Sequence, residues 1–90
     1  MIINFEDTFD KDINNIKETK ILYRIEQASF NVRDALTMHD IRKLKKLKGY
    51  KFFYRIRVGD YRIGVTIIGD TVTFLKCLPR KDFYKHFPPK

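Results

Sequence analysis

The feature that most constrains this chain is the alternation of apolar and charged residues on both sides of Gly59-Asp60. Alternation of this kind is typical of a strand with one buried and one solvent-facing side, and a pair of turn-forming residues between two such strands predicts a β-hairpin. A two-residue loop sets Arg57 opposite Arg62 and leaves Arg55 on the same side. The three arginines therefore share the solvent-facing side of the predicted hairpin.

Like charges that face each other across a sheet are destabilising, so the pairing of Arg57 with Arg62 indicates a surface that binds an anion. Gly64, predicted opposite Arg55, would leave an open floor where the backbone of a ligand could approach closely. The alternative is the ordinary solvated face of a half-buried hairpin. Alternation by itself favours this simpler interpretation, so the choice depends on the rest of the chain.

The charge of the whole chain points to an anionic partner. Its 90 residues include 19 Lys and Arg against 11 Asp and Glu, which gives a formal net charge of +8. Nucleic acid is the first candidate and an acidic protein the second. The length suits one small domain over residues 1–90. No stretch approaches the roughly 20 apolar residues of a membrane-spanning helix, and Cys77 is the only cysteine, so we expect a cytoplasmic protein without an internal disulfide.

Hydrophobic periodicity predicts an α+β domain, in which helices cover one face of a largely antiparallel sheet. The predicted elements are a strand over 2–5, a short helix over about 9–16, a longer helix over 20–35 capped by Thr19, and strands over 50–58, 61–68 and 71–78. Periodicity fails over 37–49. We interpret that segment as a loop or short turn whose leucines pack against the sheet while its cations stay in water.

A second tight turn at Gly69-Asp70 allows the register of the hairpin to be continued into the last predicted strand. This register puts Lys76 on the face that the helices should cover, a conflict that a bulge or the end of the sheet would resolve. It also sets Cys77 opposite Arg62, and we expect Cys77 to be a packed strand residue.

A short C-terminal helix is predicted after Pro79, over residues 80–87. Arg80 and Tyr84 are four residues apart and so lie on one side of that helix. Because the helix begins where the last strand ends, Arg80 should emerge beside the arginine hairpin. Other basic residues extend the same positive surface, and the candidates for contact with RNA are Lys45, Lys46, Lys48, Lys81 and His86.

Clustered arginines suit phosphodiester chemistry in RNA, where the ribose 2′-OH can attack its own phosphate. Guanidinium groups stabilise the charge that builds on the phosphate oxygens, and losing one such donor costs about 3 to 4 kcal/mol of barrier in comparable sites. Arginine is a poor base, so Tyr84, His86 or a lysine would have to assist. Tyr84 could equally cover the core, and His86 could be an exposed helix end. The spacing of His, Cys, acidic and Gly residues predicts no metal site, phosphate loop or cofactor.

Three blocks of this sequence resemble the RelE family of toxin-antitoxin toxins, within the wider RelE/ParE superfamily. The blocks are Lys46-Leu47-Lys48-Gly49, the hairpin from Tyr54 to Arg62, and Pro79-Arg80-Lys81-Asp82-Phe83-Tyr84. The resemblance implies a ribosome-dependent endoribonuclease that cuts mRNA in the A site and is neutralised by an antitoxin encoded beside it. It also implies a set of catalytic positions, namely Arg55, Arg57, Arg62, Arg80 and Tyr84.

Two departures from the family pattern leave the proton acceptor open: arginine occupies strand positions where some members carry lysine, and Pro79 stands where many relatives carry histidine. Two other functions also stay open. One is a ParE-like toxin that inhibits gyrase by binding it, and the other is a basic module that binds DNA or its antitoxin without catalysis. The net charge predicts an acidic, partly disordered antitoxin that wraps the domain and shields the arginines, and through which operator DNA could be bound.

Overall fold

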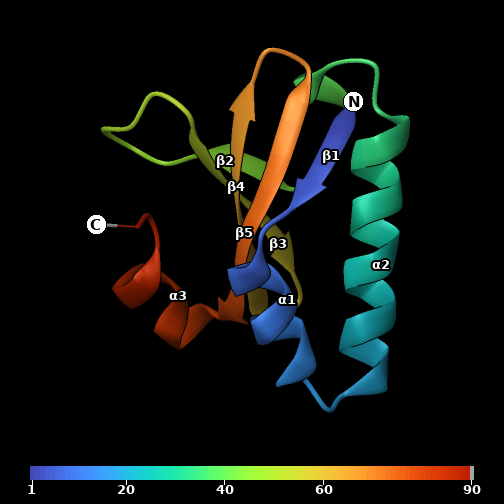
Figure 1. Cartoon of the computed structure of the whole chain (residues 1–90), viewed down its shortest axis with the longest axis vertical. Coiled ribbons are helices and arrows are strands. Elements are labelled where there is room, and N and C mark those ends of the chain that lie inside the picture. The colour runs from blue at the N-terminus through green and yellow to red at the C-terminus, as the bar shows by residue number, and fades with distance from the viewer. Residues whose placement is uncertain (90) are drawn as a thin grey trace.

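In the computed structural model, which describes residues 1–89, five strands form one sheet in the order β1-β5-β4-β3-β2 (Figure 1). β1 is parallel to β5, and the other neighbours are antiparallel. The elements are β1 (Ile2–Phe5), α1 (Asp7–Asn14), α2 (Thr19–Asp34), the 3-10 turn η1 (Met38–Asp40), β2 (Leu44–Lys46), β3 (Phe53–Val58), β4 (Tyr61–Ile68), β5 (Thr71–Pro79) and α3 (Arg80–His86). The predicted α+β class and the antiparallel meander are confirmed.

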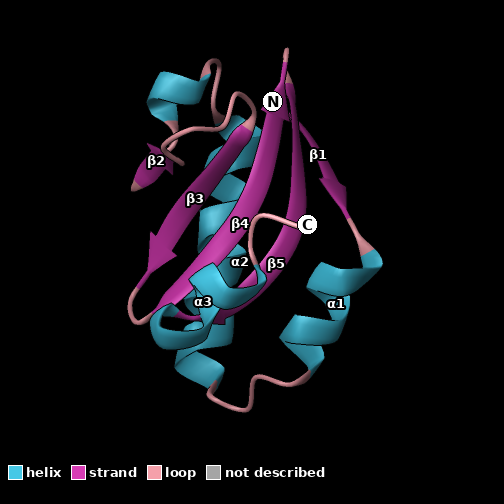
Figure 2. Cartoon of the chain, turned by 90° about the vertical axis from the view of Figure 1, so that its left-hand side faces the viewer, coloured by secondary structure: helices cyan, strands magenta, loops and turns pink. Residues whose placement is uncertain are grey.

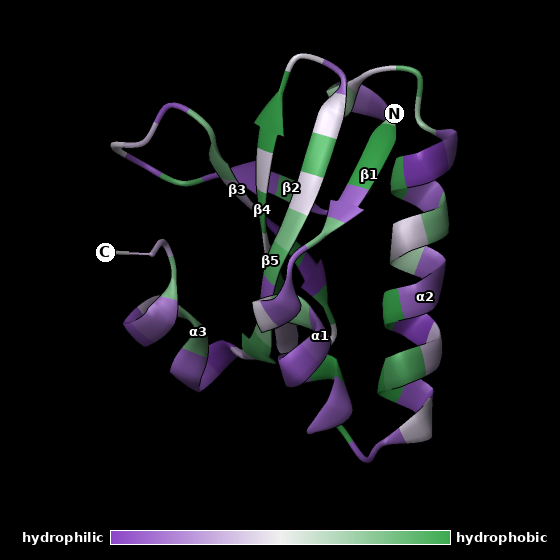
Figure 3. Cartoon of the chain, viewed as in Figure 1, coloured by the Kyte–Doolittle hydropathy of each residue, from purple (hydrophilic) through white to green (hydrophobic). Residues whose placement is uncertain are grey.

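The face of the sheet that α2 covers carries the hydrophobic core. Figure 3 shows the apolar positions of α2 turned toward the sheet and its hydrophilic positions on the outer side. The buried side chains of this core are Phe9, Ile16, Ile25, Val32, Ala35, Ile41, Ile56, Val58, Ile63, Val65, Ile67, Val72, Phe74 and Cys77. Alternation along β3, β4 and β5 therefore places the core where the sequence predicts it. None of the helices within residues 1–89 is both long and apolar enough to cross a membrane.

The sheet has one strand more than the sequence predicts. Residues 44–46 form β2 and pair with β3, so the prediction of a loop over 37–49 is wrong there. Three residues are too few to display a period, and their pairing depends on the edge of β3 rather than on their own pattern. Other boundaries differ as well: α1 begins at Asp7 and ends at Asn14, β3 begins at Phe53, and Thr19 is the first residue of α2. Glu18 occupies the N-cap of α2 without a side-chain hydrogen bond.

A β-bulge in β5 changes the predicted register. The register shifts just after Gly64 of β4, and Leu75 is left without a partner. The shift sets Lys76 opposite Gly64, on the face away from the core, which resolves the conflict that the sequence presents. The Lys76 ammonium lies 3.1 Å from a carboxylate oxygen of Asp12 in α1. The same carboxylate accepts a hydrogen bond of 2.8 Å from the backbone N–H of Cys77, so Asp12 ties α1 to the edge of β5.

Candidate catalytic site

The hairpin of β3 and β4 has the predicted register, with Arg57 opposite Arg62 and Arg55 opposite Gly64. Its turn depends on Gly59, whose φ of 58° lies in the left-handed region that glycine adopts without strain. The three arginines lie on the face of the sheet opposite the core. Arg57 is exposed, while Arg55 and Arg62 are half-buried.

Backbone carbonyl groups, rather than acids, hold two of these arginines. Arg55 Nη1 donates to the carbonyl oxygen of Lys43 at 3.0 Å. Arg62 Nη1 donates to the carbonyl oxygens of Gly59 and Tyr61 at 3.0 and 3.1 Å. Within residues 1–89 no carboxylate forms an ion pair with either guanidinium. Their positive charge is therefore available to an external anion.

The start of α3 lies beside the hairpin turn. Pro79, the last residue of β5, is opposite Tyr61, and the backbone N–H of Arg80 donates to the carbonyl oxygen of Asp60 at 2.7 Å. Arg80 thus begins α3 directly next to the turn, as the sequence predicts. Tyr84 follows one helical turn later and is 55% exposed. The bulge places Leu78 rather than Cys77 opposite Arg62, so that predicted pairing is wrong.

Arg62 is at the electrostatic centre of the cluster. Burial lowers the pKa of its guanidinium, and the positive charge of Arg55 lowers it further. The charges of Arg80 and Arg57 also lower the pKa of Arg62, whereas Tyr84 raises it. Desolvation and like charges disfavour the charged form of a cation, and a bound anion reverses the second effect. We define these five residues, Arg55, Arg57, Arg62, Arg80 and Tyr84, as the arginine cluster.

The lysines before β3 divide between the two faces of the sheet. Lys45 is opposite Arg55 and therefore shares the face of the arginine cluster. Lys46 is opposite Tyr54 and lies on the other face. Lys48 is exposed in the loop that follows β2. The register thus brings Lys45, and not Lys46, beside the arginines.

The other candidate residues lie on α3, where both Lys81 and His86 are exposed. Lys81, Arg80 and Tyr84 line one side of a pocket of about 700 Å³ next to the hairpin turn. His86 does not line this pocket, since it follows Tyr84 by two residues and so lies about 200° further around the helix. Within residues 1–89, no three His, Cys, Asp or Glu side chains converge as metal ligands would.

Gly64 is not the open floor that the sequence predicts, because Phe87 covers it. A Cβ atom added at Gly64 would lie 2.6 Å from two carbon atoms of the Phe87 ring. That ring also packs against Phe53 with centroids 5.4 Å apart, and Phe83 beside it is fully buried. Figure 2 shows α3 in front of the sheet and α2 behind it. Glycine within a strand often marks a place where another group comes close to the backbone. At Gly64 that group is the Phe87 ring of the same chain.

Comparison with known proteins gives the family. Toxin RelE3 of Methanocaldococcus jannaschii is 39% identical to this chain over 89 residues, which are 98% of this chain and 100% of that protein. The chain belongs to the RelE family of toxins. No protein-family model matches the sequence.

Solved structures of RelE proteins share the fold. The RelE toxin in the RelB-RelE antitoxin-toxin complex from Methanococcus jannaschii matches with a TM-score of 0.78 and 39% identity, covering 94% of this chain and 99% of that chain. The archaeal RelE-RelB complex from Pyrococcus horikoshii OT3 matches with a TM-score of 0.70 and 19% identity, covering 88% of this chain and 93% of that chain. The second match supports the fold alone.

Two of the three blocks that resemble RelE sequences come together in this RelE-family chain. Residues 46–49 end β2 and begin the loop after it, residues 54–62 form the arginine hairpin, and residues 79–84 join β5 to α3. The second and third blocks meet beside the hairpin turn, where Arg80 contacts Asp60, whereas the first block lies at the opposite end of β3, where Lys46 pairs with Tyr54. Sequence reasoning did not find the packing of Phe87 on the sheet face away from the core, although the glycine at position 64 was a signal for it.

Proposed function

We propose that this RelE-family toxin is a ribosome-dependent endoribonuclease that cleaves mRNA and thereby inhibits translation in the cytoplasm. The observation that carries the proposal is the environment of Arg62. Its guanidinium is half-buried among three other arginines, and it donates to backbone carbonyls rather than to a carboxylate within residues 1–89. Such a site favours a ligand whose negative charge grows during the reaction, as the charge on a phosphate does when it is attacked.

In the proposed reaction, the ribose 2′ oxygen forms a bond to the adjacent phosphorus while the bond from phosphorus to the 5′ oxygen of the next nucleotide breaks. The products are a 2′,3′-cyclic phosphate and a free 5′-OH. The proton of the 2′-OH leaves as the new bond forms, and a proton reaches the departing 5′ oxygen. Arg55, Arg57 and Arg62 donate hydrogen bonds to the non-bridging oxygens, where the negative charge builds.

Tyr84 has the best position for orienting the 2′-OH or stacking on a base, because it is exposed beside Arg62 and Arg80. Lys45 is the lysine that the register sets next to the arginines. These two residues are therefore the first candidates for moving the proton, since arginine accepts one poorly. His86 is less suitable because it lies on another side of α3 from Tyr84.

We further propose that the partner of this toxin is an acidic, partly disordered antitoxin that wraps the domain. A net charge of +8, and four arginines that form no ion pair with a carboxylate of residues 1–89, suit a flexible chain rich in Asp and Glu. The solved RelE structures named above are complexes with RelB. Contacts with operator DNA would be made through that antitoxin. Co-expression of the neighbouring small reading frame should restore growth to cells that express the toxin, and failure of every adjacent frame to do so would contradict this partner.

Primer extension on mRNA in a translating extract tests the nuclease. The wild-type protein should create new 5′ ends within coding sequence, and Arg62→Ala should reduce their rate of formation by about 10² to 10³, the usual effect of losing one oxyanion donor. Lys11→Ala is the control, because Lys11 is an exposed cation on α1 and belongs neither to the arginine cluster nor to its neighbouring elements. Absence of new ends, or equal cutting by Arg62→Ala, would contradict the proposal. Inhibition of gyrase supercoiling without new mRNA ends would identify a ParE-like toxin instead.

A further inference from the structure

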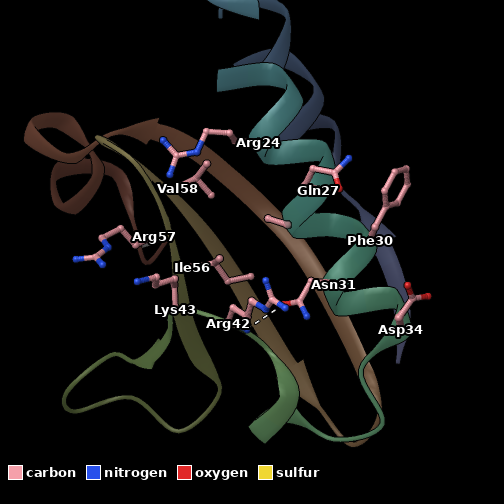
Figure 4. A pocket seen from close by; sticks show the side chains of 11 residues that line it. Arg24, Gln27, Phe30, Asn31, Asp34, Arg42, Lys43, Ile56, Arg57 and Val58 are labelled. Atoms are coloured by element: carbon pink, nitrogen blue, oxygen red, sulfur yellow. Dashed lines mark hydrogen bonds between the residues drawn. The ribbon is translucent and has the colours of Figure 1, made fainter. Parts of the chain in front are cut away.

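A basic groove runs between α2 and the end of β3 (Figure 4). It encloses about 510 Å³ and carries cations on both sides. Arg24 belongs to α2, Arg42 and Lys43 to the segment before β2, and Arg57 to β3. Figure 4 shows Arg24 reaching from the helix toward Val58, whereas Lys43 and Arg57 extend on the side of the strand away from the helix. We call this feature the α2–β3 groove.

The cations of the α2–β3 groove have no acidic partner within the part of the chain that the structure describes. Asp34 is the acid that lines the groove, and its carboxylate is already paired with Arg33 at 3.0 Å. The segment that carries Arg42 is held in place by Asn31, whose side-chain oxygen accepts from the backbone N–H of Arg42 at 2.9 Å. The groove therefore presents uncompensated positive charge, which suits an anionic ligand.

The groove offers little to a docking protein segment. Ile56 and Val58 on its floor are only 2% and 4% exposed, so an amphipathic helix would find little apolar surface to bury. The backbone N–H of Arg57 already donates to the carbonyl oxygen of Lys43 at 3.3 Å, which removes it as a donor to an added strand. Phe30 is 38% exposed, but its ring lies 4.7 Å from the Arg33 guanidinium and points away from Arg24 and Val58 (Figure 4). The positive charge of the groove, rather than aromatic surface, therefore favours RNA over a docking protein segment.

The α2–β3 groove is continuous with the arginine cluster, because Arg57 belongs to both. Arg24 extends the positive surface to the hairpin turn, where its Nη1 lies 2.9 Å from the position that a Cβ atom on Gly59 would occupy. Positive charge thus passes from one face of the sheet around the end of β3 to the other. An RNA strand whose cleaved phosphate lies at Arg62 could continue past Arg57 into the α2–β3 groove.

We propose that the α2–β3 groove binds the phosphate backbone of RNA at a distance from the bond that is cut, with Arg24 and Arg42 as its principal contacts. The RNA belongs either to the strand that is cleaved or to the ribosome, and both sources supply the same phosphates. The inference rests on the proposed function, because a ribosome-dependent ribonuclease would meet both mRNA and ribosomal RNA. Its test measures binding and requires no cleavage.

The test measures binding of a labelled 2′-O-methyl oligonucleotide, which cannot be cut, by fluorescence anisotropy at several salt concentrations. Each cation that neutralises a phosphate of a single strand adds about 0.7 to the steepness of log K against log salt, so Arg24→Gln with Arg42→Gln should reduce that steepness by about 1.4. The matched control is Lys11→Gln with Lys17→Gln, which removes the same charge from exposed positions on and after α1. That control should leave the slope unchanged.

A second measurement, sedimentation with vacant ribosomes, identifies the source of the RNA. Weaker binding of the oligonucleotide by the groove variant assigns the groove to the cleaved strand, and weaker binding to ribosomes alone assigns it to ribosomal RNA. An unchanged slope together with unchanged sedimentation would overturn the inference. So would a variant that loses binding only to polyglutamate, since the groove would then fit an acidic protein.

Circular dichroism shows whether each variant is folded, and Arg42→Gln with Lys43→Gln replaces the first pair if Arg24→Gln disturbs the hairpin turn. A wild-type protein that makes no new mRNA ends but binds RNA with the expected slope difference would refute the nuclease and retain the groove. If the wild-type protein cuts mRNA but the groove variant binds RNA like wild type, the nuclease proposal would stand and the groove proposal would fail. The two proposals therefore fail separately.

Discussion

The two faces of the five-stranded sheet differ in what their side chains do for the fold. On the face beneath α2, Ile63, Val65 and Phe74 are fully buried, and their contacts are apolar. On the other face, Arg57 is opposite Arg62, and Lys45 is opposite Arg55, so like charges meet across the strands. The first arrangement stabilises the sheet and the second opposes it. Substitutions of the core side chains should consequently change stability, whereas substitutions of the clustered arginines should change RNA chemistry.

Phe74→Ala should have the largest effect on stability. Phe74 is fully buried, and its ring packs against Phe5 and Phe9 with centroids 5.1 and 5.3 Å away. Removing a buried aromatic ring lowers the free energy of unfolding by about 3 to 5 kcal/mol. Urea denaturation followed by circular dichroism measures this loss. Ile68→Ala, at a position 58% exposed, is the control, and an equal loss at both positions would show that burial does not govern stability on this sheet.

Gly64→Ala tests whether α3 is firmly packed on the arginine face. The new methyl group would meet the Phe87 ring at 2.6 Å, so either the ring or the strand must move. Overpacking of this kind typically lowers the free energy of unfolding by about 1 to 3 kcal/mol. Displacing α3 would also move Arg80 and Tyr84, and mRNA cleavage should fall with stability. A variant with unchanged urea stability and cleavage would mean that Phe87 does not hold α3 in place.

Asp12→Ala tests the connection between α1 and the edge of β5. It leaves the backbone N–H of Cys77 without an acceptor and removes the partner of Lys76, so a loss of about 1 to 3 kcal/mol in unfolding free energy is expected. Asp34→Ala is a matched control, because Asp34 also forms an ion pair but is 68% exposed, and exposed pairs contribute little to stability. Equal losses in urea denaturation would refute the special role of Asp12.

Cys77 should make a smaller contribution to stability, and one that depends on pH. Burial, together with the nearby charge of Asp12, raises the pKa of its thiol to about 12. The folded protein therefore retains the thiol proton above pH 9.0, the ordinary value, whereas the unfolded chain loses it. The unfolding free energy should fall as pH rises above that value. Alkylation with iodoacetamide should be slow in the folded protein and fast in urea, and rapid labelling of the folded protein would contradict this burial.

The hairpin and the core face could be predicted because both follow from local patterns. Alternation around Gly59-Asp60 specifies the register of β3 with β4, and that register predicts which arginines share a face. Three features depend on contacts between distant parts of the chain; the sequence predicted neither β2 nor the packing of Phe87, and it offered the bulge only as one of two ways to resolve the position of Lys76. β2 exists because β3 offers it an edge, the bulge at Leu75 arises between two strands, and Phe87 reaches Gly64 from beyond the sheet.

The candidate site shows the same division. The position of Arg80 beside the turn could be predicted from Pro79 and the end of β5, and the structure has it there. The placement of Lys45 and Lys46 on opposite faces of the sheet could not be predicted, because it depends on the pairing of β2 with β3. Nor could the α2–β3 groove, since Arg24 and Arg57 come from elements that only the tertiary fold brings together.

The most direct test of the central claim is the stability of wild type and Arg62→Gln by urea denaturation, with and without saturating 2′-O-methyl RNA. Without RNA, Arg62→Gln should be as stable as wild type or slightly more stable, because like charges near Arg62 are relieved. With RNA at about 100 times the Kd of wild type, the unfolding free energy of wild type should rise by about 2.7 kcal/mol. That of the variant should rise clearly less at the same RNA concentration. A variant that is less stable without RNA, and gains as much as wild type when RNA is added, would show that Arg62 serves the fold rather than an anion.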